Sequence, residues 1–307
     1  MENDDPQKQT EDLLKSINEA KKRGDAAAVE RLSFEFMAAA SALVDPNDPG
    51  ILASRRADEL ANEGQFDEAE NYYKKSLEIY SARGRTNSHV EGQLVGLYRM
   101  LDRNADALAA ARAAEARYAD APYGFLRVKP LPALAGCALS CGDLSTARDA
   151  ITRALHIINL EKSQSSMMAS LLVLRAEYLL KSNDPIGCGE DLQTAREILN
   201  HSPLGEWAAG YQSTYANLSA GTARLHEDRK DYLAAVEAWR EAVKRREWVA
   251  NAPQLAGPYA KAGLERTLRG LARALILVKS EMEAKVVLER ANYIRAKIWL
   301  APFPGAE

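Results

Sequence analysis

Apolar residues recur along this chain at the spacing of amphipathic helices, and short polar turns separate the apolar segments in pairs. Positions three and four apart lie on one face of an α-helix, so each segment predicts one helix. Gly64 separates the clearest pair, and glycine readily takes the left-handed conformation that ends a helix. The apolar positions on either side of it are Ala53, Ala57 and Leu60, then Ala69, Tyr73 and Leu77. This pattern predicts two antiparallel helices joined by a turn at residues 64–68.

The same turn recurs seven times, and each copy ends on a small or apolar residue. The copies end at Val29, Ala69, Ala107, Ala147, Cys188, Ala235 and Ala284. Successive end points lie 40, 38, 40, 41, 47 and 49 residues apart. A small residue suits this position because two antiparallel helices cross closely there. Self-similarity at a period of about 20–50 residues is typical of stacked-repeat proteins, so we expect an elongated array.

The repeats account for nearly all of the 307 residues and leave no room for a second globular unit. We expect a helical repeat domain over residues 10–300, a disordered N-terminal tail over residues 1–9 and a C-terminal tail over residues 301–307. The last two spacings need extended helices or longer loops. The surplus is expected at residues 203–212 and 251–258.

The repeat unit resembles that of the tetratricopeptide repeat (TPR) family, which carries a Gly-x-aromatic-x-x-Ala signature. The segment Gly64–Ala69, followed by Tyr73, is a close match, and Gly142–Ala147 is a good one. Every unit here is longer than the family's usual length of about 34 residues, as in its long-unit branch. HEAT-type repeats have a compatible length but a different turn chemistry. The resemblance implies an all-α, right-handed superhelical solenoid of about seven helical hairpins, with the first helix of each on a concave surface.

The charge and the cysteine content narrow the possible environments. A net charge of −3 creates no global field that would attract nucleic acid or an anionic membrane. No stretch approaches the roughly 18 uninterrupted apolar residues of a membrane span, and the acidic start of the chain is unlike a secretory signal. Three cysteines without a CxxC spacing form no disulfide framework. We therefore expect a cytoplasmic protein that binds no nucleic acid and does not insert into a membrane.

Enzyme motifs are absent from the sequence. It has no phosphate-binding loop, no dinucleotide-binding glycine pattern, no zinc-protease motif and no nucleophile elbow. The four histidines fall in different repeats without ligand spacing. Cys137 and Cys141 lie on one helical face, which favours a tight helix contact over a reactive or metal-binding pair. The sequence thus predicts no catalytic activity, no cofactor and no metal.

Candidate partner-binding residues come from the positions that the repeat register places on the concave face. They are His89, Gly92 and Gly96 in the third unit, and Lys129 and Gly136 in the fourth. Glycine inside a helix costs about 1 kcal/mol relative to alanine, so these glycines need a reason. They either let a bound peptide backbone approach the helices or allow close packing between neighbouring repeats.

In the seventh unit the inward positions hold Arg266, Arg269 and Arg273, which form one basic stripe. Arginine binds carboxylate or phosphate in a bidentate manner, so the stripe is a candidate anchor for an acidic or C-terminal peptide segment. The alternative is a solvated face whose arginines pair with Glu265 and with the acidic helix before it.

The resemblance implies a non-catalytic function, and we expect a scaffold or adaptor that binds a peptide or helix of a partner protein in the concave groove. The alternative is a ligand-responsive regulatory (sensor) protein that controls a separate effector chain. The last helix is followed by the apolar residues Ile298, Trp299, Leu300 and Phe303, with no polar capping helix after them. Repeat arrays normally need a polar end, so this end either folds back or forms a homodimer contact through the C-terminal repeat.

Overall fold

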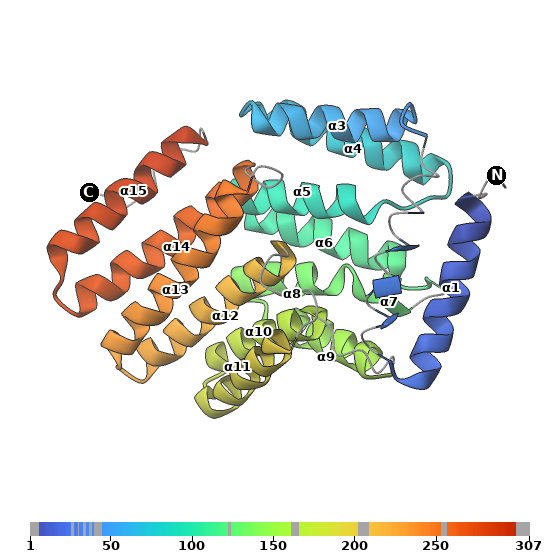
Figure 1. The fold of residues 1–307 in the computed structure, drawn as a ribbon. Coiled ribbons are helices and arrows are strands. Elements are labelled where there is room, and N and C mark those ends of the chain that lie inside the picture. Colours follow the sequence, from blue (N-terminus) through green and yellow to red (C-terminus); the bar gives the residue numbers. More distant parts are fainter. Residues whose placement is uncertain are drawn as a thin grey trace.

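The computed structural model describes residues 6–25, 45–121, 124–160, 166–201, 209–252 and 257–298, with a few residues between 28 and 39. These residues are arranged as helices joined by short turns, and no strand occurs among them (Figure 1). Helix α1 (Pro6–Arg23) begins inside the segment that was expected to be a disordered tail, so residues 6–9 are helical. The predicted C-terminal tail, residues 301–307, lies outside the described residues.

Consecutive helices pack as antiparallel hairpins, and the hairpins stack into the expected right-handed superhelix (Figure 1). A short helix, α7 (Gly124–Val128), precedes the third complete hairpin. The hairpins are α3 (Pro49–Asn62) with α4 (Phe66–Ala82), α5 (Ser88–Met100) with α6 (Asn104–Tyr118), α8 (Leu131–Cys141) with α9 (Leu144–Leu160), α10 (Ser166–Lys181) with α11 (Pro185–Asn200), α12 (Ala209–Asp228) with α13 (Tyr232–Asn251), and α14 (Pro258–Leu277) with α15 (Glu281–Lys297).

Each of the seven predicted turns contains one residue with positive φ, five positions before the residue that ends the turn. These residues are Gly24, Gly64, Asp102, Gly142, Asn183, Lys230 and Lys279, with φ between 57° and 80°. The N–H of the following residue donates to a carbonyl five residues earlier, as from Gln65 to Leu60 at 2.8 Å and from Ser280 to Leu275 at 2.9 Å. This bond belongs to the Schellman ending of a helix. The repeat register is therefore confirmed by the backbone itself.

Two substitutions test the cost of this turn. Gly142→Ala is expected to lower the free energy of unfolding by about 1 kcal/mol, because an L-residue is strained at positive φ. An added Cβ would meet no atom within 4 Å there, so the effect is purely conformational. Lys279→Gly is expected to raise stability by roughly 0.5 kcal/mol, since relief of the strain outweighs the added freedom of the unfolded chain. Urea denaturation measures both, and equal stability of Gly142→Ala and the wild type would contradict the prediction.

The small residue that ends each turn is buried where two helices cross. Ala69, Ala147 and Ala235 have no exposed surface, and Cys188 takes the same place with 1% exposed. A larger residue four positions later fills the wider space beside the crossing, as Tyr73 does. The longer late repeats are built in part from longer helices, since α12, α13 and α14 have 20 residues each. The predicted surplus segments lie partly outside the described residues.

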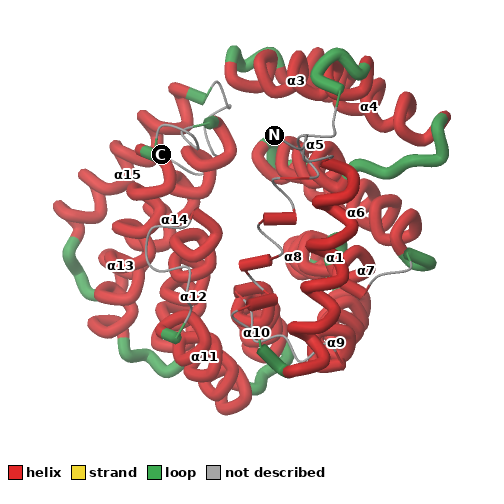
Figure 2. Tube along the Cα trace, turned by 45° about the vertical axis from the view of Figure 1, so that its right-hand side comes forward, coloured by secondary structure: helices red, strands yellow, loops and turns green. Residues whose placement is uncertain are grey.

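The superhelix closes on itself through the first helices of its hairpins. Helix α5 contacts α8, α8 contacts α10, α10 contacts α12, α12 contacts α14, and α14 returns to α5. Figure 2 shows the hairpins curving round from α3 to α15. An open solenoid has contacts between neighbouring repeats only, so this closure departs from the expected elongated array. The superhelix is closed by contacts between α14 and α5.

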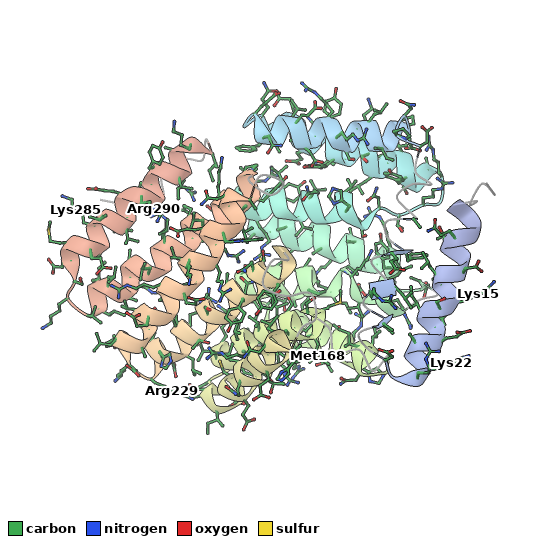
Figure 3. All side chains as sticks on the ribbon, viewed as in Figure 1. Lys15, Lys22, Met168, Arg229, Lys285 and Arg290 are labelled. Carbon is green, nitrogen blue, oxygen red and sulfur yellow. The ribbon has the colours of Figure 1, made fainter. Side chains whose placement is uncertain are left out.

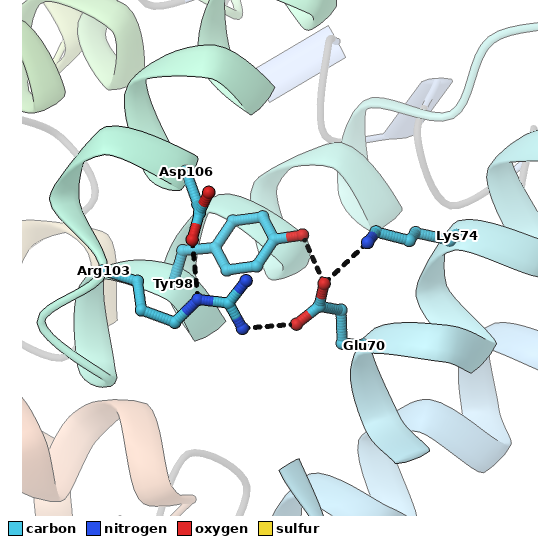
Figure 4. A network of polar contacts seen from close by, with 5 residues as sticks. All are labelled: Glu70, Lys74, Tyr98, Arg103 and Asp106. Atoms are coloured by element: carbon cyan, nitrogen blue, oxygen red, sulfur yellow. Dashed lines mark hydrogen bonds and ion pairs between the residues drawn. The ribbon is translucent and has the colours of Figure 1, made fainter. Parts of the chain in front are cut away.

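A buried carboxylate joins α4 to the turn between α5 and α6 (Figure 4). Glu70 accepts hydrogen bonds from Lys74 at 2.6 Å, from Tyr98 at 2.9 Å and from Arg103 at 2.6 Å. Burial alone would raise the pKa of Glu70, but these three donors outweigh it and hold the pKa below its ordinary value of 4.5. The carboxylate therefore stabilises the fold in its charged form.

Glu70→Gln is expected to lower the free energy of unfolding by about 2 kcal/mol at pH 7, because it removes charge-assisted hydrogen bonds. A depressed carboxyl pKa contributes stability that is complete above the ordinary value of 4.5 and is lost as the pH falls through the lower value of the folded protein. The stability difference between wild type and variant should therefore shrink below about pH 4. Urea titrations at several pH values measure it, and a difference that is constant with pH would contradict this role of the charge.

Candidate functional site

The contact that closes the superhelix, which we call the seam, joins α14 and α15 to α4, α5 and the turn after α5. Hydrogen bonds between described residues of distant repeats span it. Tyr259 and Tyr73 share a hydrogen bond of 3.2 Å between their hydroxyls, and Arg266 Nη1 donates to the main-chain oxygen of Arg99 at 3.0 Å. Arg295 Nη2 donates to Asp102 Oδ2 at 2.8 Å. The paired residues lie 186, 167 and 193 positions apart in the chain.

The tyrosine pair belongs to a small polar network. Tyr73 Oη donates to Asp58 Oδ1 at 2.5 Å, and Gln93 Nε2 donates to the same oxygen at 3.2 Å. Gly96 lies beneath the Tyr259 ring, since a Cβ at this glycine would be 3.5 Å from the ring. Burial raises the pKa of Tyr259 to about 12, and the negative charge of Asp58 adds to the effect. Tyr259 therefore stays protonated at neutral pH and can donate at the seam.

Three arginines lie near one another at the seam, and we call them the interior arginines: Arg99 of α5, Arg246 of α13 and Arg266 of α14. Arg246 Nη2 donates to Asn217 Oδ1 of α12. Two glycines make room for the guanidinium groups. A Cβ at Gly136 would lie 3.7 Å from Arg99 Nη1, and one at Gly263 would lie 3.6 Å from Arg246 Nη1. The interior arginines thus lie where α5, α8, α12 and α14 come together.

The electrostatics of the interior arginines are unfavourable. Burial, together with repulsion by Arg266 and Arg99, lowers the pKa of Arg246 to about 10. The pKa of Arg266 is lowered as well, by burial first and then by Arg99. Arg99 and Arg266 nevertheless reach solvent, and Arg246 is half-buried. None of the three forms an ion pair with a carboxylate of the described residues, whereas Arg295 at the same seam pairs with Asp102 at 2.8 Å.

The structure brings three of the predicted site residues to the seam. Gly96 faces Tyr259, Gly136 faces Arg99, and Arg266 is itself an interior arginine. Gly96 and Gly136 admit neighbouring side chains in this structure, so they serve close packing between repeats here. A role of these residues in binding a partner stays a prediction.

Three other predicted residues lie nearer the starts of α5 and α8. The His89 N–H donates to Asn87 Oδ1 at the start of α5, and its side chain is exposed. Lys129 Nζ approaches Ser88 Oγ at 3.5 Å. Gly92 and Lys129 line a cavity of about 50 Å³ between α5, α6 and α8. A cavity of this size has room for a few waters and is too small for a peptide.

The remaining predicted residues, Arg269 and Arg273, are neutralised within the protein. Arg269 Nε donates to Glu265 at 2.5 Å, and Arg273 Nη2 donates to Glu227 of α12 at 2.7 Å. Arg269 thus has the Glu265 partner that the alternative from the sequence named, while the partner of Arg273 lies two helices earlier. A role of these two arginines in binding a partner stays a prediction. Of the basic stripe, Arg266 is the member that lies among the interior arginines.

Sequence reasoning missed Arg99, Arg246 and the tyrosine pair. Arg99 follows Gly96 by three positions and so continues the same face of α5, a signal that was available. Arg246 lies in a second helix, where the repeat register gave no reason to look. Tyr73 was identified as core packing, and its link to Tyr259 depends on the closure of the superhelix.

The C-terminal helix has an exposed apolar side. Met282 is 79% exposed, and Val286 and Tyr293 are 63% exposed each. Ile298 is buried, while residues 299–303 of the predicted apolar end lie outside the described residues. Long charged side chains such as Lys285 and Arg290 project from the same helix (Figure 3). The homodimer contact through this repeat stays a prediction.

No group of His, Cys, Asp or Glu side chains in the part of the chain that the structure describes could hold a metal ion. Among the described helices, none combines the length and the apolar character that crossing a membrane requires.

Comparison by sequence gives no relatives for this chain. It matches no family model, and it matches no curated protein.

Comparison by structure finds solved helical-repeat proteins of low sequence identity. The chain resembles NprR in complex with its cognate peptide NprX, with a TM-score of 0.57 and 12% identity over 97% of this chain and 82% of NprR. It resembles a Rap protein complexed with competence and sporulation factor, with a TM-score of 0.54 and 14% identity over 94% and 99% of the two chains. A signal-transduction ATPase with a TPR sensor, PH0952 from Pyrococcus horikoshii, matches at a TM-score of 0.50 and 12% identity over 97% of this chain and 42% of that one.

These similarities establish the fold class. The protein is an all-α helical-repeat solenoid. Its fold is that of the tetratricopeptide-repeat proteins, as the turn signatures predicted.

Proposed function

We propose that this protein is a non-catalytic peptide-binding protein, which holds an extended segment or a helix of a partner against the first helices of its repeats. The observation that carries the proposal is the set of interior arginines, which are cationic, reach solvent and have no ion-pair partner among the described residues. Neighbouring charged groups whose pKa values are shifted by burial and by one another are candidates for a functional site. The solved structures of NprR with its cognate peptide NprX and of a Rap protein with competence and sporulation factor support the proposal, since both proteins share this fold and each was solved in a complex.

A photo-crosslinking experiment tests where a peptide binds. Heptapeptides selected from a random displayed library against the full chain are resynthesised with a benzoylphenylalanine, and the cross-linked residues are mapped by mass spectrometry. We expect cross-links on α5, α8, α10, α12 and α14, because these first helices form the closed ring. Cross-links confined to second helices such as α6 and α9 would contradict the proposal. Failure to select any binding peptide would also contradict it.

The seam favours a second candidate function, that of a ligand-responsive regulator of a separate effector chain. A closure held by a few polar contacts between distant hairpins can be shifted by a ligand that binds open and closed forms unequally. Small-angle scattering with and without a selected peptide distinguishes the two functions. A change in the radius of gyration on binding supports the regulator, and an unchanged radius supports the adaptor.

A further inference from the structure

The interior arginines come from both sides of the seam. Arg99 belongs to α5, whereas Arg246 and Arg266 belong to the last two hairpins. The hydrogen bonds that Arg246 and Arg266 donate to described residues reach neutral oxygens, the Asn217 amide and the Arg99 carbonyl. Closing the superhelix therefore brings positive charges together, and no carboxylate of the described residues forms an ion pair with them, although Asp102 and Glu265 offset part of the repulsion at Arg266.

Repulsion among the interior arginines opposes the closure of the superhelix. Like charges in a partly desolvated position repel each other more strongly than they do in water. The neighbouring contacts of the seam are built differently, because Arg295 meets Asp102 and Tyr73 meets Asp58. If the seam served stability alone, we would expect the positions of the interior arginines to hold neutral residues or arginines paired with carboxylates.

We propose that a carboxylate of the bound peptide bridges Arg99, Arg246 and Arg266 and thereby holds the seam closed. This inference rests on the proposed function, because it takes a peptide as the ligand. Guanidinium groups present planar pairs of donors that match a carboxylate, and the resulting charge-assisted hydrogen bonds are strong. A carboxylate between the two sides replaces repulsion with attraction, so peptide binding and closure favour each other.

Retention of defined peptide pools tests the ligand chemistry. Four heptapeptide pools of random uncharged residues are dialysed against the full chain, and the retained peptides are quantified by mass spectrometry. Three pools have blocked ends and Glu, Gln or Lys at the central position, and the fourth has central Gln with a free C-terminal carboxylate. We expect the Glu pool or the free-carboxylate pool to be retained about tenfold more strongly than the blocked Gln pool. The pool that is retained identifies the source of the carboxylate.

Matched variants connect this preference to the interior arginines. Arg246→Gln and Arg99→Gln are each expected to remove most of the preference. Arg148→Gln on α9 removes an equal charge from an exposed arginine without an ion pair among the described residues, and it should leave the preference unchanged. Thermal melting followed by circular dichroism checks folding. Arg246→Gln should melt no lower than the wild type, because it removes a charge that burial disfavours.

The outcomes separate this inference from the proposed function. Retention of both carboxylate pools no stronger than that of the blocked Gln pool, a preference for the Lys pool, or a carboxylate preference that survives in Arg246→Gln overturns the inference while peptide binding stands. Failure to retain any pool contradicts peptide binding itself and overturns both.

Electron-electron double resonance tests the link to closure. Nitroxides are placed on Ala105→Cys in α6 and Ala296→Cys in α15, two exposed positions near the Arg295–Asp102 contact, in a Cys141→Ser background. An acidic peptide should narrow the distance distribution in the wild type and leave it unchanged in Arg246→Gln. A distribution that the bound acidic peptide does not alter overturns the link to closure.

Discussion

Glu265→Gln is expected to lower the free energy of unfolding by about 3 kcal/mol, one of the two largest effects that we predict. Glu265 is 2% exposed, accepts from Arg269 at 2.5 Å and lies 3.8 Å from Arg295. Removing one member of a buried ion cluster is costly because the opposite charges stay buried without their compensation. Arg295 also reaches across the seam to Asp102, so the variant weakens the closure as well.

Urea denaturation measures the effect, and Glu237→Gln is the matched control. Glu237 also accepts from an arginine, Arg240, at 2.6 Å, but its side chain is 71% exposed. Exposed ion pairs contribute little, so the control should lose less than about 0.5 kcal/mol. Similar losses in the two variants would show that Glu265 has no special place in the seam.

Tyr73→Ala is expected to cost about 4 kcal/mol, because Tyr73 has no exposed surface and its ring fills the space beside the α3–α4 crossing. Tyr73→Phe keeps the ring and removes only the hydroxyl, which bonds Asp58 and Tyr259. The loss in Tyr73→Phe should therefore be smaller, about 1–2 kcal/mol.

The adjacent tyrosine provides the control for this series. Tyr72 is 36% exposed, so Tyr72→Ala should lose less than about 1 kcal/mol. Thermal or urea unfolding of the three variants gives the ranking. If Tyr72→Ala were as destabilising as Tyr73→Ala, the assignment of these two neighbours to surface and core would be wrong.

The hairpins were predictable because their signals are local. Gly64, Ala69 and Tyr73 lie within one short segment of the chain and together determine one hairpin. Because the sequence pattern repeats, the same local geometry is expected in the other copies. Lys230 and Lys279 show the strength of the period, since lysine has no preference for positive φ and yet takes it there. The period assigned those turns correctly although their residues did not favour them.

The closure of the superhelix was not predictable in this way. It depends on small rotations between successive hairpins, which add up over five first helices. No single repeat carries a sequence signal for these rotations. The partners Tyr73 and Tyr259 therefore looked like unrelated aromatic residues, and Arg246 looked like one more charge on a second helix. The sequence placed Arg266 on one helical face with Arg269 and Arg273, and the structure pairs these two with Glu265 and Glu227.

The closed seam also changes how this repeat protein should unfold. In an open array the last hairpin is supported from one side only, so it frays first and the loss proceeds inward. Here α14 and α15 are supported by α13 and also by the α5–α6 hairpin, through residues as far as 193 positions away. Loss of either hairpin removes support from the other. The last repeat should therefore melt together with the middle of the chain, in one cooperative transition, rather than fray from the C-terminal side.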